Sequence, residues 1–206
     1  MTFIQTVPED AADSELAELY QADVDADGFV GNMTRAFSLR PGALRAWEQL
    51  GEVIRADMDL RTYELATLAA ARRLRSSYCS LAHGKKVLVA GILDAEQLRD
   101  VMADHHAAGL DDADVAVMDL ADKVTADATS VTEKDLDRLR DQGWTDAAIL
   151  DVILTAALRC FFSKVLDATG TRPDPSFRTD PLLTQPPDLL PTLTPGREIA
   201  EGHSPG

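Results

Sequence analysis

Apolar residues recur every three or four positions along most of the chain, which is the spacing of an amphipathic α-helix. Trp47, Leu50 and Ile54 follow this spacing, and no segment alternates between apolar and polar residues as a half-buried strand would. The pattern predicts helices over residues 10–23, 42–57, 61–75, 77–90, 112–128, 133–141 and 145–169, with short ones from Asn32 or Thr34 to Leu39 and from Asp94 to about residue 106. We therefore predict an all-α fold, a bundle of about eight helices.

Residues with strong turn and capping preferences separate these helices. Residues 24–32 contain Gly28 and Gly31, so this stretch is predicted to be a loop. Serine is a favoured residue at the start of a helix, because its hydroxyl accepts a hydrogen bond from a free backbone amide. Either Ser76 or Ser77 is therefore expected to cap the helix that follows.

The helix predicted over 145–169 is apolar on nearly every face between Ile149 and Leu166, although Asp151 and Arg159 interrupt it. A helix of this kind is either central in its domain or covered by another subunit. One small subunit can hardly cover it on all sides, so we expect the chain to form a homo-oligomer.

The character of the chain changes at Pro173, because eight of the ten prolines lie between Pro173 and Pro205. We divide the chain into a helical domain, residues 1–175, and a proline-rich arm or tail, residues 176–206. The last ten or so residues are expected to be disordered. Residues 176–193 are expected to form an extended arm that lies on a neighbouring subunit.

Charge and cysteine content limit the classes of function. The 206 residues include 20 Lys and Arg and 35 Asp and Glu, a formal net charge of −15. Such a surface repels phosphate backbones and anionic lipid headgroups, so we expect neither a nucleic acid nor a membrane as partner. The N-terminal residues lack the features of a signal peptide, and two cysteines do not suggest a disulfide framework. We expect a cytoplasmic protein with reduced thiols.

The candidate chemistry lies between Glu64 and His83. Cys79 and His83 are four residues apart on a predicted helix, so their side chains share a face and are expected to interact. An imidazole beside a thiol can accept its proton or stabilise the thiolate. Glu64, on the preceding helix, is expected to orient the imidazole or relay a proton, and burial near a thiol would raise its pKa.

Less specific interpretations remain for these residues. A cysteine and a histidine at this spacing also occur together by chance in structural helices. Arg72, Arg73 and Arg75 would add positive potential near the thiol if they point towards it, and they are also typical of surfaces and subunit interfaces. Cys160, inside the most apolar helix, is expected to be a small core residue.

A metal site or a bound cofactor is not expected. His105 and His106 follow Asp104, but adjacent residues on a helix point about 100° apart, so the two imidazoles would form a poor chelate. The sequence also lacks a glycine-rich phosphate loop and a Gly-x-Ser-x-Gly nucleophile motif.

The stretch 61–88 resembles the core motif of the alkylhydroperoxidase D (AhpD)-like and carboxymuconolactone decarboxylase superfamily. That motif is a glutamate, a Cys-x-x-Cys pair beginning twelve residues later, and a histidine four residues after the second cysteine. Glu64, Cys79 and His83 stand at the glutamate, the second cysteine and the histidine. The stretch from Phe161 to Asp174 also resembles the uncharacterised peroxidase-related branch, and the resemblance extends over about residues 10–175.

The resemblance implies an AhpD-like helical fold and either a trimer or a hexamer built from dimers or trimers. It also implies thiol chemistry, with Ser76 standing where the family has its first cysteine. In peroxidase members the second cysteine attacks the peroxide and the first resolves the product by forming a disulfide. Ser76 cannot form that bond, so an external thiol or dithiol would have to reduce a sulfenic acid on Cys79. The two roles that remain expected for Ser76 are a hydrogen bond to the thiolate and capping of the helix.

Three functions follow from this resemblance. The first is a one-cysteine, peroxidase-like oxidoreductase that acts on a small hydroperoxide, with Cys79 as nucleophile, His83 as base or thiolate partner and Glu64 as proton relay. The second is a non-redox acid–base enzyme of the carboxymuconolactone decarboxylase type, with His83 and Glu64 acting on a small carboxylate or lactone. The third is a non-catalytic family member that serves as a binding or assembly subunit.

Overall fold

The structure is a computed structural model that describes residues 2–179. In that part of the chain it has ten α-helices, three 3₁₀ turns and no strand, which confirms the all-α prediction. The helices are α1 (Ser14–Asp27), α2 (Asn32–Ala36), α3 (Pro41–Arg55), α4 (Leu60–Leu74), α5 (Ser77–Val89), α6 (Ala95–Asp104), α7 (Asp112–Asp127), α8 (Glu133–Arg140), α9 (Asp146–Ala168) and α10 (Pro175–Thr179). The 3₁₀ turns are Glu9–Ala11, His105–Ala107 and Ala128–Ser130.

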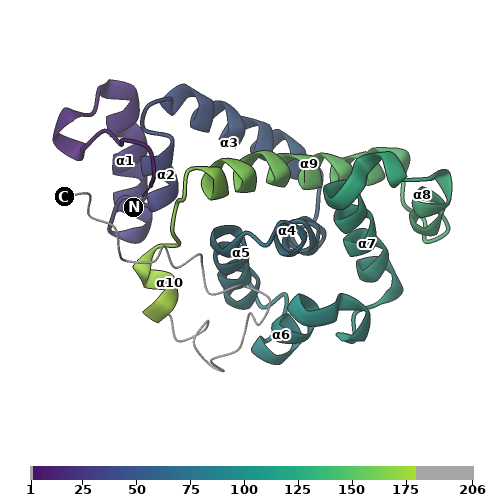
Figure 1. Ribbon diagram of the computed structural model, residues 1–206. Coiled ribbons are helices and arrows are strands. Elements are labelled where there is room, and N and C mark those ends of the chain that lie inside the picture. The colour runs from purple at the N-terminus through teal and green to yellow at the C-terminus, as the bar shows by residue number, and fades with distance from the viewer. Residues whose placement is uncertain (1, 180–206) are drawn as a thin grey trace, which may run out of the picture.

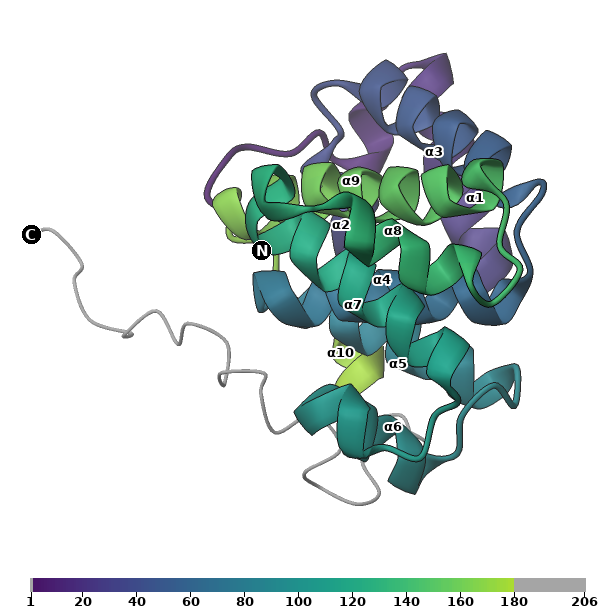
Figure 2. The ribbon, with the colours of Figure 1, turned by 90° about the vertical axis from the view of Figure 1, so that its right-hand side faces the viewer.

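Helix α4 forms the centre of the bundle. Every residue from Thr62 to Ala71 is buried, and several of these residues are alanines. Small side chains allow close approach of neighbouring helices, and α5, α7 and α9 pack around α4 (Figure 1). Helix α3 covers the outer side of α9, while α6 lies at the end of the molecule farthest from α3 (Figure 2). None of the described helices is long and apolar enough to cross a lipid bilayer.

Acidic caps begin several of the helices. At the start of α4 the carboxylate of Asp59 accepts a hydrogen bond of 2.9 Å from the backbone N–H of Thr62. A carboxylate at this position satisfies a free amide and also interacts favourably with the positive end of the helix dipole. Asp13, Asp94 and Asp111 have the same role at α1, α6 and α7. Part of the large negative charge is therefore used to set helix boundaries.

The predicted boundaries of the first helix are wrong by four residues at each end. Helix α1 begins after Asp13, whose carboxylate accepts from the backbone N–H of Leu16. It ends at Gly28, which adopts a left-handed conformation with φ of 81° that favours glycine. Four of the residues expected in a loop, Val24–Asp27, are therefore helical. The loop that remains is short, residues 28–31, and it connects α1 to α2.

The segment that follows α9 turns back onto the domain. Asp174 accepts a hydrogen bond of 2.9 Å from the backbone N–H of Asn32. The ring of Phe177, in α10, packs edge-on against the ring of Tyr78, with 5.8 Å between centroids. Residues 176–179 are therefore helical and attached to their own subunit, contrary to the extended arm expected there. The rest of the predicted tail, 180–206, lies outside the described residues.

Candidate active site

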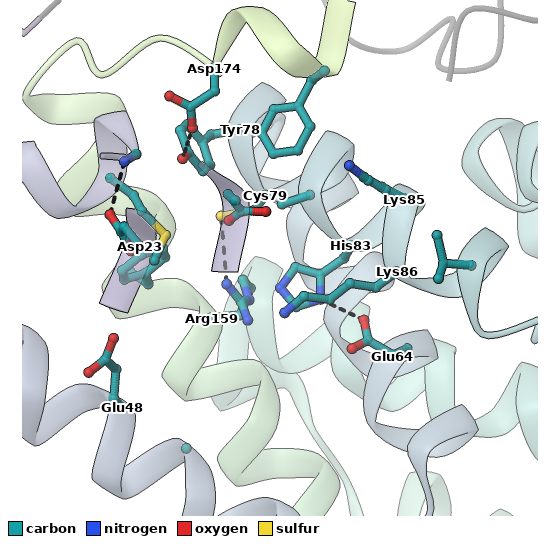
Figure 3. Close-up of a pocket in the computed structure, with 18 of the residues that line it drawn as sticks. Asp23, Glu48, Glu64, Tyr78, Cys79, His83, Lys85, Lys86, Arg159 and Asp174 are labelled. Carbon is teal, nitrogen blue, oxygen red and sulfur yellow. Dashed lines mark hydrogen bonds and ion pairs between the residues drawn. The ribbon is translucent and has the colours of Figure 1, made fainter. Parts of the chain in front are cut away.

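A cavity of about 940 Å³ lies among α1, α3, α4, α5, α9 and α10. Three of the four candidate residues, Glu64, Cys79 and His83, line it, and the fourth, Ser76, does not. The cavity therefore contains three of the residues that the sequence predicts to be reactive. The side chains that contact these residues differ from the expected ones (Figure 3).

Glu64 and His83 form a buried pair. Helices α4 and α5 pack against each other, and this brings a carboxylate oxygen of Glu64 to 2.5 Å from Nδ1 of His83. Their side chains are only 4% and 6% exposed, so water competes little for the bond. The expected contact between the two residues is present, and it assigns the Nδ1 proton to the hydrogen bond with the carboxylate.

The pKa of each partner is shifted downward. Burial, followed by the charge of Arg159, lowers the pKa of His83 to about 3. Burial alone would raise the pKa of Glu64, as expected from the sequence. The charge and hydrogen bond of His83, with the positive charges of Lys86 and Arg159, outweigh burial, so the pKa of Glu64 is lowered. The expectation of a raised pKa is therefore wrong, and at neutral pH the pair is a carboxylate and a neutral imidazole.

We expect His83 to stay uncharged well below pH 6.5, its ordinary pKa. Because the folded protein then binds fewer protons than the unfolded chain, this histidine contributes stability in full above pH 6.5. The contribution is lost as pH falls towards about 3. Imidazole ¹⁵N chemical shifts followed by NMR, with the His83 signal assigned from a His83→Gln variant, measure the pKa directly. A titration midpoint near 6.5 would contradict this assignment.

Cys79 has two hydrogen-bond donors, and neither is His83. The hydroxyl of Ser163 lies 3.1 Å from Sγ, and Nη1 of Arg159 lies 3.7 Å from it. Both residues come from α9, more than 75 residues away along the chain. Among the described residues no hydrogen bond joins Cys79 to His83, so the expected direct pair is wrong. Nδ1 of the imidazole is hydrogen-bonded to Glu64 instead.

Arg159 links the sulfur to the Glu64–His83 pair. Its guanidinium donates to Cys79 and also lies close enough to shift the pKa values of Glu64 and His83. The sequence signal was present, because Arg159 and Ser163 are four residues apart and share one face of a mostly apolar helix. Polar residues at that spacing in a buried helix indicate a common partner, which here is Cys79.

Ser76 does not reach the sulfur. It stands at the N-cap position of α5, but its side chain makes no capping hydrogen bond. Its hydroxyl donates to Asp167 of α9 instead, at 3.4 Å. Ser76 therefore joins α5 to α9, and neither of its two expected roles, capping the helix or binding the thiolate, is present.

The upstream arginines also face away from the cavity. Arg73 pairs with Asp122 of α7, and Arg72 contacts both Asp122 and His105. None of Arg72, Arg73 and Arg75 lines the cavity. The cation in contact with the thiol is Arg159 instead.

Acidic residues occupy the opposite side of the cavity. Figure 3 places Asp23 and Glu48 on one side, and His83, Lys85 and Lys86 on the other, with Arg159 between them. Burial raises the pKa of Asp23, and burial together with the charge of Asp23 raises the pKa of Glu48. The cavity thus has a cationic and an acidic side.

Tyr78 and Asp174 close the cavity towards α10. The phenol of Tyr78 donates a buried hydrogen bond to the carboxylate of Asp174. Burial, followed by this carboxylate, raises the pKa of Tyr78, so the phenol stays protonated. Tyr78 is buried, and it also lines the cavity.

His105 and His106 are arranged differently from the expectation. Their ring centroids lie 4.2 Å apart, because His105–Ala107 is a 3₁₀ turn rather than the end of a helix. Together with Asp104 they offer possible ligand atoms within 4.8 Å of one another. His105 is held between Arg72 and Asp119, with 2.9 Å to each. A metal ion bound to either ring nitrogen of His105 would have to displace the partner of that nitrogen, so the group fits an ion poorly.

Comparison with solved structures defines the class of fold as AhpD-like. An uncharacterised peroxidase-related protein with an alkylhydroperoxidase AhpD core, from Ralstonia eutropha JMP134, is 23% identical, with a TM-score of 0.72 over 85% of this chain and 94% of that chain. A peroxidase-related protein from Silicibacter sp. TM1040 is 21% identical, with a TM-score of 0.74 over 85% and 93%. The debrominase Bmp8 is 13% identical, with a TM-score of 0.69 over 93% and 96%. At these identities the likeness concerns the fold.

A family model also matches part of the sequence. The model of the carboxymuconolactone decarboxylase family matches residues 41–123, a segment that contains Glu64, Cys79 and His83. The match confirms the resemblance drawn from the three residues. No curated protein matches the chain.

Proposed function

We propose that this protein is a thiol-dependent, peroxidase-like oxidoreductase with a single catalytic cysteine, Cys79. One observation carries the proposal. The sulfur of Cys79 lines a cavity and accepts hydrogen bonds from Ser163 and Arg159. A hydroxyl and a guanidinium aimed at one sulfur stabilise negative charge on it, and the thiolate is the nucleophilic form.

The reaction balances with a hydroperoxide and an external thiol. The Cys79 thiolate attacks the outer oxygen of the hydroperoxide, an S–O bond forms and the O–O bond breaks. The cysteine is oxidised to a sulfenic acid, and the leaving alkoxide takes a proton to become an alcohol. One external thiol then attacks the sulfenic acid, which releases water and leaves a mixed disulfide with Cys79. A second external thiol attacks this mixed disulfide, so that Cys79 returns to its reduced form and the two external thiols leave as a disulfide.

The Glu64–His83 pair has the protonation state of a general base. Nδ1–H of the neutral imidazole donates to the Glu64 carboxylate, so Nε2 is the nitrogen that accepts a proton. Since no hydrogen bond joins this imidazole to the sulfur within residues 2–179, the proton of the thiol reaches it through a water molecule or through the hydroperoxide. Glu64 stabilises the imidazolium that forms.

Stoichiometric hydrogen peroxide followed by a sulfenic-acid trap tests the proposal directly. We expect the reduced protein to gain one trap adduct, located at Cys79 by peptide mass analysis. Cys160 is the internal control, because it is a free cysteine with intermediate burial in the same protein. Equal labelling of both cysteines, or labelling of Cys160 alone, would remove the basis of the proposal.

A second candidate is the non-redox acid–base enzyme of the carboxymuconolactone decarboxylase type. The separation of the Glu64–His83 pair from the sulfur favours it, since the pair can work on a substrate without the thiol. A Cys79→Ser variant that keeps full activity on the physiological substrate would select this alternative. Loss of all turnover in both assays, with stoichiometric binding to a protein partner, would select the non-catalytic role.

We also propose that the chain self-associates through α3 and α9. Leu150, Leu154, Ala157 and Phe161 share one exposed face of α9, at the four- and three-residue spacing of a coiled-coil seam. Leu50 and Val53 of the adjacent α3 are 51% and 72% exposed. A second copy would cover these exposed apolar side chains of the two packed helices.

Light scattering of the full chain is expected to give a multiple of 22.3 kDa. A Leu154→Glu, Phe161→Glu double variant is expected to shift the protein to the monomer, because it introduces charge into the apolar face. Leu39→Glu is the matched control, since Leu39 is 53% exposed and lies outside both helices. A monomeric wild-type protein would refute self-association.

A further inference from the structure

Arg159 is a buried cation that no salt bridge joins to a carboxylate within residues 2–179. The residue is 2% exposed, and its Nε has no hydrogen-bond partner. Its one described hydrogen bond goes to the sulfur of Cys79, and the nearby carboxylate of Glu64 is bound to His83. The charge of Arg159 interacts with that of Glu64 and lowers the pKa of Glu64, but the two residues form no direct bond. A ligand with a negative group would supply a direct partner for the buried guanidinium. Because Arg159 lines the cavity, such a ligand has access to it.

The cavity is also rich in aromatic side chains. The whole chain has two tryptophans, three tyrosines and six phenylalanines. Six of these eleven residues line this one cavity: Phe29, Trp47, Tyr63, Tyr78, Phe162 and Phe177. Two of them, Trp47 and Phe162, have their ring centroids 5.7 Å from the guanidinium carbon of Arg159. Flat apolar walls beside a cation suit a planar ligand with a negative group.

We propose that the cavity binds a small aromatic carboxylate, whose negative group pairs with Arg159 and whose ring packs among the aromatic side chains. This proposal goes beyond the proposed function, whose substrate is a hydroperoxide, and adds a ligand class for the same cavity. The binding itself requires no turnover. A carboxylate held by Arg159 would lie next to the Cys79 sulfur, since Nη1 is only 3.7 Å from it.

The charge distribution fixes the direction in which the ligand enters. Asp23 and Glu48 line the side of the cavity opposite to Lys85 and Lys86 (Figure 3). A carboxylate placed on the acidic side would be repelled, whereas beside Arg159 it is attracted. The uncharged part of the ligand therefore faces Asp23 and Glu48, and the negative part faces the sulfur.

The test is equilibrium binding to the full-length, reduced protein without any peroxide. Trp47 serves as a fluorescent reporter in a Trp144→Phe background, because the chain has only two tryptophans. Calorimetry provides an independent affinity. The probes are benzoate, its neutral isostere benzamide, and acetate, which keeps the charge without the ring. We expect benzoate to bind at least about tenfold more tightly than either of the others.

Variants assign the selectivity to Arg159. Arg159→Met is expected to weaken benzoate binding at least about tenfold and to leave benzamide binding unchanged. Arg55→Met is the matched control, because Arg55 also lines the cavity but is solvent-exposed, beside the ring of Tyr63. It is expected to change benzoate affinity by less than about twofold, as its charge is screened by water. If Arg159→Met does not fold, the affinities of the wild-type protein for benzoate and for benzamide decide alone whether the cavity prefers a carboxylate.

Three results would overturn the proposal. These are equal affinities for benzoate and benzamide, no benzoate binding at about 1 mM, and equal losses in the Arg159 and Arg55 variants. None of them depends on thiol chemistry. If benzoate binds selectively but the sulfenic-acid experiment fails, the peroxidase function is rejected and the binding site is kept. If Cys79 forms a sulfenic acid but benzoate does not bind selectively, the peroxidase function is kept and the binding site is rejected.

Discussion

Replacement of Cys79 by serine is expected to abolish thiol-dependent peroxide reduction, with a loss in kcat/KM on the order of a thousandfold or more. Serine keeps the shape of the side chain, and its hydroxyl can still accept hydrogen bonds from Ser163 and Arg159. A neutral hydroxyl is, however, a poor nucleophile towards an O–O bond, and it has no sulfenic acid state. The measurement is peroxide consumption in the presence of a small dithiol.

Cys160→Ser is the control for this prediction. It removes the other free thiol, which is on α9 and does not line the cavity, so it is expected to keep wild-type activity. Thermal unfolding should be nearly the same for both serine variants, because each change is almost isosteric. If Cys79→Ser retained peroxide reduction, or if Cys160→Ser lost it, Cys79 would not be the nucleophile.

The His83→Gln substitution has the second largest expected effect, a loss of about a hundredfold to ten-thousandfold in kcat. Glutamine can still donate to Glu64 but cannot accept a proton at pH 7. Glu64→Gln should cause a smaller loss, because the imidazole remains while the carboxylate that stabilises its charged form is gone. Since the pKa of His83 is about 3, the wild-type rate should show no fall from this group between about pH 8 and pH 5.

His105→Gln is a matched control for the histidine prediction. His105 is also a buried histidine paired with a carboxylate, that of Asp119, but it does not line the cavity. The variant is expected to be less stable and to retain its activity per folded molecule. Equal losses of kcat in the two variants would mean that both histidines act through stability alone.

Most helices could be predicted from the sequence, because their boundaries depend on local chemistry. The Thr132–Asp135 capping box and Pro41 in the first turn of α3 are examples in which one or two residues decide a helix end. Helix α1 was misplaced because Asp13, its cap, was read as an ordinary helical residue. The turn at Gly28 was assigned to a longer loop, although a single left-handed residue is enough to end a helix.

Only the part of the site that lies within residues 61–88 could be predicted from the sequence. Glu64, Cys79 and His83 lie on consecutive helices, so the family motif and helical spacing bring them to one cavity. Arg159 and Ser163 come from α9, and their pairing with Cys79 depends on how that helix packs across α5. No pattern within residues 61–88 contains that information. The same distant packing directs Ser76 to Asp167 and commits the imidazole to Glu64 rather than to the sulfur.

Because α4 and α5 supply the reacting groups while α9 supplies Arg159 and Ser163, the site is completed late in biosynthesis. A ribosome that has translated only as far as α8 has already made Cys79, but not the two donors that hold its sulfur. Until α9 docks, this thiol is an ordinary cysteine on an unfinished chain. The oxidation chemistry that we propose at Cys79 would thus depend on completion of folding, and we expect truncated or misfolded products to lack it.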